Sequence, residues 1–172
     1  MMLHSLPGII AVALSSFAAV AVGTFAAAGE PSWVTYRSPS GFYSIDHPSG
    51  WRVERDENIV NIVPGDESGA VTISAYIGEA TTDRAERLIS ETFTTQRPTS
   101  PLLTVVGSGW TGVRRTFDDK SHTPPLEWVV MVATNASGMV IITLNEVSPR
   151  IPERAPIYTR IFESLQLSTL KR

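Results

Sequence analysis

Cysteine is absent from the 172-residue chain, and lysine occurs only at positions 120 and 171. Without cysteine the chain can carry neither the disulfide bonds of small secreted scaffolds nor the lipid of a bacterial lipoprotein. A domain of this length buries roughly 70% of its unfolded surface, so a hydrophobic core can stabilise it without cross-links. We therefore expect a fold that depends on packing alone.

Charged residues are also absent from the first 28 positions, which are rich in Ala, Val, Ile and Leu. Such a segment predicts a secretory signal peptide, with Ala26 and Ala28 as the small pair before cleavage and Pro31 ending the helix of the leader. The alternative is a retained N-terminal anchor, because about 20 apolar residues suffice to span a bilayer. Either interpretation predicts an extracytoplasmic domain over residues 29–172, which is periplasmic, secreted or anchored through residues 1–28. The lack of cysteine favours a bacterial envelope.

The formal net charge is -3, and neither sign forms a run along the sequence. A protein that binds nucleic acid or anionic lipid through its charge needs a basic patch, and none is visible here. We therefore expect no nucleic-acid partner, and membrane contact only through residues 1–28 if they are retained.

Alternating and β-branched patterns predict most of the domain to be strands. Residues 32–37 and 41–47 predict a hairpin around a Ser-Pro-Ser turn, and an extended piece from residue 51 leads to 59–63. Further strands are predicted at 71–77, 102–106, 109–117, 126–134 and 139–147. The strand at 126–134 is apolar on both faces, so it is expected to be central and covered on two sides.

Two segments have the helical period instead. Asp83 and Glu86 fit a helix start, and the apolar residues that follow lie on one face until Pro98 forbids continuation near Gln96. The second helix begins near residue 152, with Pro156 in its first turn. The order of elements predicts an α+β fold, an antiparallel sheet covered by helices.

The segment from Ser40 to Trp51 reads SGFYSIDHPSGW and resembles the opening of the PsbP-like and DcrB-like domain family, in which a Gly-Phe pair followed by a Pro-x-x-Trp pattern forms a hairpin and turn. The segments Gly109–Arg115 and Ile161–Leu165 are also similar to that group. This resemblance implies a PsbP-like sandwich over most of residues 29–172. It further implies a domain that binds protein partners rather than one that catalyses a reaction.

Catalytic signatures are weak. His47 follows Asp46, but neighbours along a strand point to opposite faces, so this aspartate cannot orient the imidazole as in a triad. No G-x-S-x-G elbow is present. The most polar cluster contains Asp118, Asp119 and His122, whose oxygen and nitrogen donors could ligate a divalent metal if the loop brought them together. A solvated acidic turn is the competing interpretation.

A second cluster combines Trp110 with Arg114 and Arg115. Arginines beside an aromatic ring are common at protein interfaces, which makes these three the candidate partner-binding residues. The competing interpretation is that both arginines pair with acidic groups across the sheet.

The sequence therefore predicts an exported, non-catalytic accessory domain that binds an envelope protein or a membrane complex and needs no cofactor. The alternative is a hydrolytic or metal-dependent enzyme that uses Asp118, Asp119 and His122. A third possibility is a small apolar ligand bound between a helix and the sheet.

Overall fold

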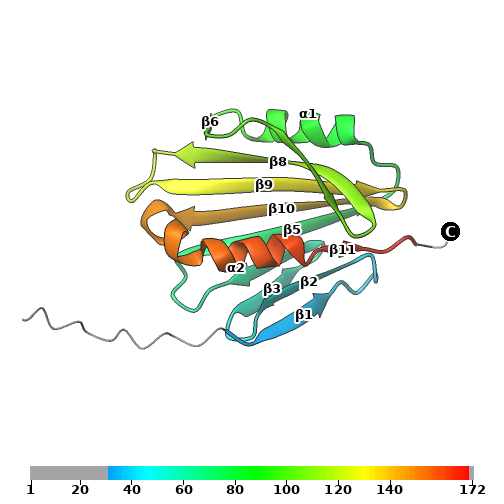
Figure 1. Ribbon diagram of the computed structural model, residues 1–172, viewed down its shortest axis with the longest axis horizontal. Helices are drawn as coiled ribbons and strands as arrows, with labels where there is room; N and C mark the ends of the chain where they lie inside the picture. Colours follow the sequence, from blue (N-terminus) through cyan, green and yellow to red (C-terminus); the bar gives the residue numbers. More distant parts are fainter. Residues whose placement is uncertain (1–30, 171–172) are drawn as a thin grey trace, which may run out of the picture. The chain divides into compact units, whose positions relative to one another are not determined.

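The computed structural model describes residues 31–170, which form β-strands, two α-helices and one short 3-10 helix (Figure 1). The predicted leader at residues 1–28 lies outside the described residues. The first half of the domain contains β1 (Trp33–Arg37), β2 (Tyr43–Pro48), β3 (Arg52–Asp56), β4 (Ile59–Val63), β5 (Gly69–Ile77) and α1 (Thr82–Thr92). The second half contains β6 (Arg97–Pro98), β7 (Leu103–Gly107), β8 (Trp110–Asp119), β9 (Leu126–Asn135), β10 (Gly138–Val147), η1 (Ser148–Arg150), α2 (Ile151–Glu163) and β11 (Gln166–Leu167).

The strands form two antiparallel sheets. The larger sheet has the order β3-β4-β5-β10-β9-β8-β6, with β7 paired to another part of β8, and the smaller sheet has the order β1-β2-β11. The predicted hairpins are confirmed, including β1 with β2 and β9 with β10, whose register joins Leu126 to Val147 and Asn135 to Gly138. The α+β fold class predicted from the order of strands and helices is therefore correct.

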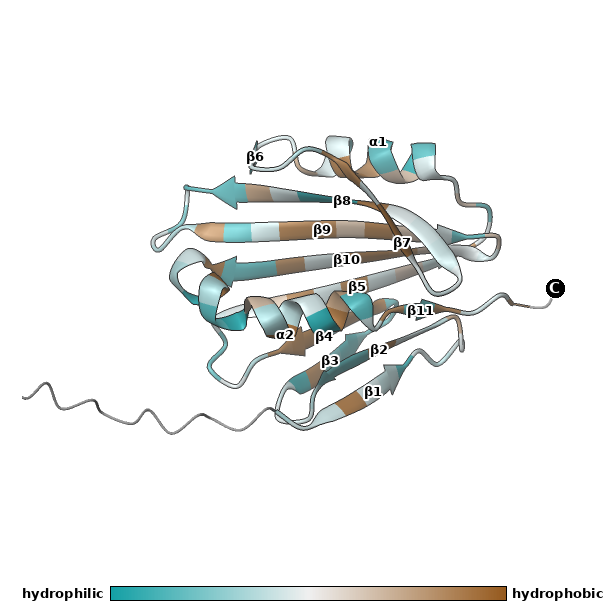
Figure 2. Ribbon diagram, viewed as in Figure 1, coloured by the Kyte–Doolittle hydropathy of each residue, from teal (hydrophilic) through white to brown (hydrophobic). Residues whose placement is uncertain are grey.

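The larger sheet is covered on both faces, as the apolar pattern of β9 predicts. Val130 and Val132 pack in a cluster with Ala85 and Ile89 of α1, on one face of the sheet. Met131 lies in the cluster on the opposite face, which includes residues of α2 and of the smaller sheet. The hydropathy colouring shows this apolar centre as brown segments along β9 and β10 (Figure 2).

Local details differ from the sequence-based expectations. The piece from residue 51 to 63 is a hairpin rather than one extended segment, and Glu57 at its turn has a left-handed φ of 47°. Helix α1 is capped by Thr81, whose hydroxyl accepts the Arg84 N–H at 3.2 Å, and ends before Phe93. In α2, Pro156 lies inside the helix rather than in its first turn. No helix within residues 31–170 is long and apolar enough to cross a membrane.

A buried ion pair connects α2 to the larger sheet. Glu146 of β10 is completely buried, and its carboxylate accepts hydrogen bonds from the Tyr158 hydroxyl at 2.6 Å and from Arg154 at 2.8 Å, both on α2. A second nitrogen of Arg154 bonds to Asp66 in the turn between β4 and β5. This guanidinium holds the pKa of the Asp66 carboxyl well below its usual range. One arginine therefore joins α2 to a strand and to a turn.

The backbone leaves room for this pair at Gly69, which is opposite Glu146 in the β5–β10 ladder. A Cβ atom at Gly69 would lie 2.2 Å from the Asn145 carbonyl oxygen and 3.1 Å from the carboxyl carbon of Glu146. Glycine is therefore required where the buried glutamate meets β5.

The substitution Arg154→Ala should destabilise the domain by about 3–5 kcal/mol, because it leaves a buried carboxylate without its cation. The matched control is Arg150→Ala, which also removes an arginine near Asp66 but from a side chain that is 46% exposed, against 13% for Arg154. That control should cost at most about 1 kcal/mol. Urea unfolding followed by tryptophan fluorescence measures both values. Equal losses in the two variants would contradict this role for the ion pair.

Candidate protein-interaction surface

Trp110 begins β8 and is a core residue. Its side chain is only 7% exposed, and its indole N–H donates a 3.0 Å hydrogen bond to the carbonyl oxygen of Leu165, just after α2. A Cβ atom at Gly107, its partner in the β7–β8 hairpin, would lie 2.1 Å from an indole carbon. Trp110 therefore joins this hairpin to the end of α2. Its ring is buried under the β7–β8 hairpin and is not available to a partner as an exposed side chain.

The two arginines of the predicted cluster lie on opposite faces of the sheet, because successive residues of a strand alternate. Arg114 lines hollows beside Phe162 of α2. Arg115 lies over the ring of Phe117 on the α1 side, 5.8 Å from its centroid, and donates to the Ser100 carbonyl at 3.3 Å. The structure thus brings Trp110 and Arg114 together and separates Arg115 from them, which corrects the expectation of one three-residue cluster.

A groove runs between α2 and the strands β7, β8, β9 and β10. It consists of two hollows of about 170 and 280 Å³ that share Arg114 and Phe162. Apolar side chains form most of its lining, contributed by Val105, Val129, Met131, Leu144, Ile151, Ala155 and Phe162. One hollow contains Glu127 and the other Glu163, and Arg114 lines both hollows. Burial, followed by the nearby charge of Asp118, raises the pKa of Glu127.

Strand β7 forms one side of this groove and has a free outer edge. Within residues 31–170 it pairs only with β8, so half of its main-chain groups face away from any ladder. Its sequence LTVVG carries no charge, and it exposes 41% of Leu103 and 76% of Val106. Figure 2 shows β7 crossing in front of β8 and β9, and its hairpin reaches β11 through a bridge between Ser108 and Gln166.

The opposite edge of the larger sheet differs in character. Strand β3 has the sequence RVERD, and four of its five residues are charged. Charged side chains on an edge strand prevent pairing with other chains, whereas an uncharged apolar edge permits it. The sequence pattern predicted a strand at residues 102–106, which corresponds to β7, but it did not predict that one edge of this strand is free. The contrast in charge between 52–56 and 103–107 is the signal that could have indicated it.

The predicted metal-binding residues lie at the far end of β8. Asp118 accepts two hydrogen bonds from Arg97, at 3.0 and 2.6 Å, which lower the pKa of its carboxyl group. Asp119 accepts hydrogen bonds from the Ser121 hydroxyl and from the Ser121 backbone N–H, and these bonds lower the pKa of its carboxyl group as well. The Nε2 atom of His122 lies 3.7 Å from the Oδ2 atom of Asp119.

The loop therefore does not bring the three side chains together around a common point. In the part of the chain that the structure describes, no three His, Asp or Glu side chains are arranged to hold a metal ion. The enzyme alternative is not favoured by this geometry.

No protein-family model and no curated protein sequence matches this chain. Among solved structures, the chain is similar to cyanobacterial PsbP (CyanoP) from Synechocystis sp. PCC 6803, with a TM-score of 0.61 and 11% identity over 86% of this chain and 99% of that one. It is also similar to LpqN, described as involved in cell envelope biogenesis of Mycobacterium tuberculosis, with a TM-score of 0.60 and 8% identity over 80% and 91% of the two chains.

A third match is a protein from Bacteroides thetaiotaomicron, with a TM-score of 0.61 and 15% identity over 78% of this chain. The present chain spans about half of that protein's length, 48%. At these identities the comparisons establish the fold. The domain has a PsbP-like fold, and this confirms the prediction made from the SGFYSIDHPSGW segment.

Calorimetric titration of the full chain with calcium, magnesium, manganese or zinc should give no heat of binding. The reason is that Asp118 is already paired with Arg97, while Asp119 is already hydrogen-bonded to Ser121. The control is Asp119→Asn, which should behave as the parent chain does. A saturable heat that this substitution abolishes would contradict the interpretation and support the metal site.

Proposed function

We propose that this chain is an exported, non-catalytic accessory domain of the bacterial envelope that acts by binding a protein partner. The charge-free leader supports export, and the PsbP-like fold is shared with LpqN, whose description places it in cell envelope biogenesis. The partner-binding surface consists of the outer edge of β7 together with the groove beside α2.

The observation that carries this proposal is the uncharged free edge of β7. An extended segment of a partner can add to such an edge as a further strand, because main-chain hydrogen bonds supply affinity and neighbouring pockets accept alternate side chains. Here the groove lies directly beside the edge, and Val105, Val106 and Arg114 line it. Apolar side chains of the partner would occupy the hollow over Met131.

Catalysis is the less supported function. Nucleophilic or acid–base chemistry requires titratable side chains that converge on one point. His47 is buried, and its Nδ1 atom is 2.9 Å from the carbonyl oxygen of Pro48, which gives the imidazole a structural partner. The groove has one glutamate in each of its two hollows, so its carboxylates do not converge on one point.

Site-specific photo-cross-linking in native membranes tests the surface. A photoreactive residue at Val106 should give a discrete cross-linked product, and the same residue at Glu54 on the β3 edge should not. The substitution Val106→Glu should reduce the amount of captured partner more than tenfold, since it places a charge at the centre of the contact. Val34→Glu, at an exposed valine of β1, is the matched control and should have no effect.

Equal products from positions 106 and 54 would overturn this assignment, and so would undiminished capture by Val106→Glu. Unfolding measurements on both variants show that the loss comes from the surface and not from the fold.

A further inference from the structure

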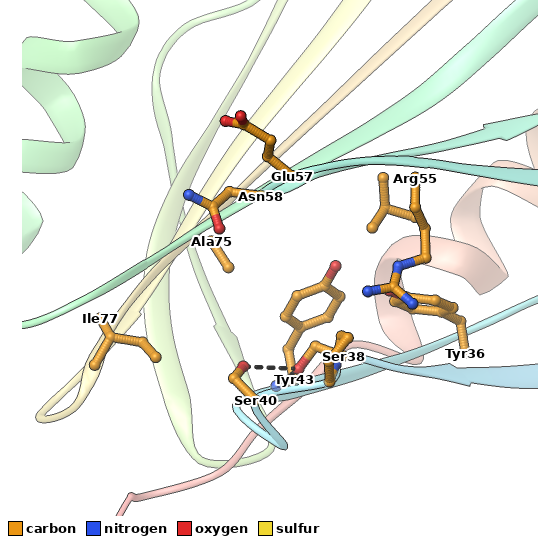
Figure 3. A pocket seen from close by; sticks show the side chains of 11 residues that line it. Tyr36, Ser38, Ser40, Tyr43, Arg55, Glu57, Asn58, Ala75 and Ile77 are labelled. Carbon is orange, nitrogen blue, oxygen red and sulfur yellow. Dashed lines mark hydrogen bonds between the residues drawn. The ribbon is translucent and has the colours of Figure 1, made fainter.

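A second concave site lies at the other edge of the larger sheet, away from β7. It is a pocket of about 250 Å³ between the turn that joins β1 to β2 and the hairpin of β3 and β4 (Figure 3). Its volume is close to the range of small-ligand sites. The groove beside α2 shares none of its residues, so the two sites are separate.

One polar atom just beneath the lining of this pocket has no hydrogen-bond partner. The hydroxyl oxygen of Tyr36 is buried, and it makes no hydrogen bond with any residue that the structure describes. Buried polar groups in folded proteins almost always have a hydrogen-bond partner, because an unpaired one keeps its desolvation cost. The Tyr36 hydroxyl is therefore a donor that can be satisfied by a ligand acceptor.

A second tyrosine lies beside it. The rings of Tyr36 and Tyr43 have centroids 6.0 Å apart, and Tyr43 is almost completely buried. Burial, followed by the neighbouring Tyr36 hydroxyl, raises the pKa of Tyr43, although the two hydroxyls do not meet hydrogen-bond geometry. The Tyr43 phenol therefore stays protonated at neutral pH and can donate.

The positive charge of the pocket comes from Arg55 of β3. Within residues 31–170 this side chain has no ion pair, whereas Arg52 on the same strand bonds to Glu54 at 2.6 Å and to Glu67 at 3.0 Å. Figure 3 shows the guanidinium of Arg55 turned toward the tyrosines and the carboxylate of Glu57 turned away from them. Arginine holds a carboxylate through two parallel hydrogen bonds, which makes an unpaired arginine in a pocket a suitable anchor.

Apolar side chains line one wall of the pocket, while Ser38, Ser40 and Asn58 line other parts of it. Val60, Ala75 and Ile77 come from the neighbouring strands β4 and β5, and Val60 is buried. One cation beside an apolar wall fits a monoanion with a compact hydrocarbon body. A phosphate ester carries more charge than this single arginine neutralises, and it would leave the apolar wall without a partner.

We propose that this pocket binds a small organic carboxylate with an apolar body. The carboxylate lies between the Arg55 guanidinium and the Tyr36 hydroxyl, and the apolar body packs against Val60, Ala75 and Ile77. This site adds a small-molecule ligand to a domain whose protein-binding surface lies at the opposite edge.

Calorimetric titration of the full chain with 3-phenylpropionate tests the assignment, with the uncharged 3-phenylpropionamide as the matched ligand. The acid should bind and the amide should not. Arg55→Gln should lower the affinity for the acid by at least tenfold. Tyr36→Phe should lower it by roughly three- to tenfold, since each substitution removes a charge-assisted hydrogen bond. Arg114→Gln removes an arginine from the other surface and should leave the affinity unchanged.

Absence of heat with the acid at millimolar concentration would overturn the proposal, and so would equal affinities for acid and amide or an unchanged affinity in Arg55→Gln. Both pocket variants should keep the parental unfolding midpoint, because Arg55 is exposed and Phe preserves the ring of Tyr36. These outcomes are independent of the cross-linking at Val106.

Discussion

The arrangement of this domain depends on the ion pair between Glu146 and Arg154. A carboxylate removed completely from water is tolerated only when a cation and further donors compensate it. Arg154 and Tyr158 provide that compensation from α2, and the Val147 N–H adds a hydrogen bond at 3.0 Å from the strand itself. Because a misplaced α2 would leave this charge unpaired, the pair restricts the helix to one position on the sheet.

The position of α2 in turn determines the surface on which the proposed function depends. Its first half is held by Arg154, and just past its end the Leu165 carbonyl accepts the Trp110 indole N–H. Between these two fixed points the helix covers only part of the sheet face, and the remaining strip forms the groove around Arg114. The β7–β8 hairpin closes the strip on its other side and leaves the outer edge of β7 free.

Local patterns were sufficient to predict much of this fold. The alternation in 126–134 and the helical period after residue 152 depend on neighbours in the sequence, and both correspond to observed elements. The ion pair was not predicted, because the sequence around a glutamate in an apolar strand does not indicate which residue of another element it will contact. The free edge of β7 was also missed, because edge position depends on the order of strands in the sheet.

The predicted partner-binding cluster shows the same limit. Strand alternation alone could have separated Arg114 from Arg115, whereas the burial of Trp110 depends on contact with a carbonyl 55 residues later in the chain. Similarly, the pocket at Tyr36 and Arg55 lies between the two sheets. Nothing in the sequence indicates that β1 and β3 come close to each other. Sites formed by distant segments required the structure.

Hydrogen exchange followed by mass spectrometry measures whether a partner binds along β7. The exchange of the full chain is measured alone and in complex with its captured partner. Binding along β7 predicts slower exchange at residues 103–107, whose outward amides gain hydrogen bonds, and unchanged exchange at residues 52–56 of β3. Unchanged exchange at 103–107, or protection confined to β3, would contradict binding along β7.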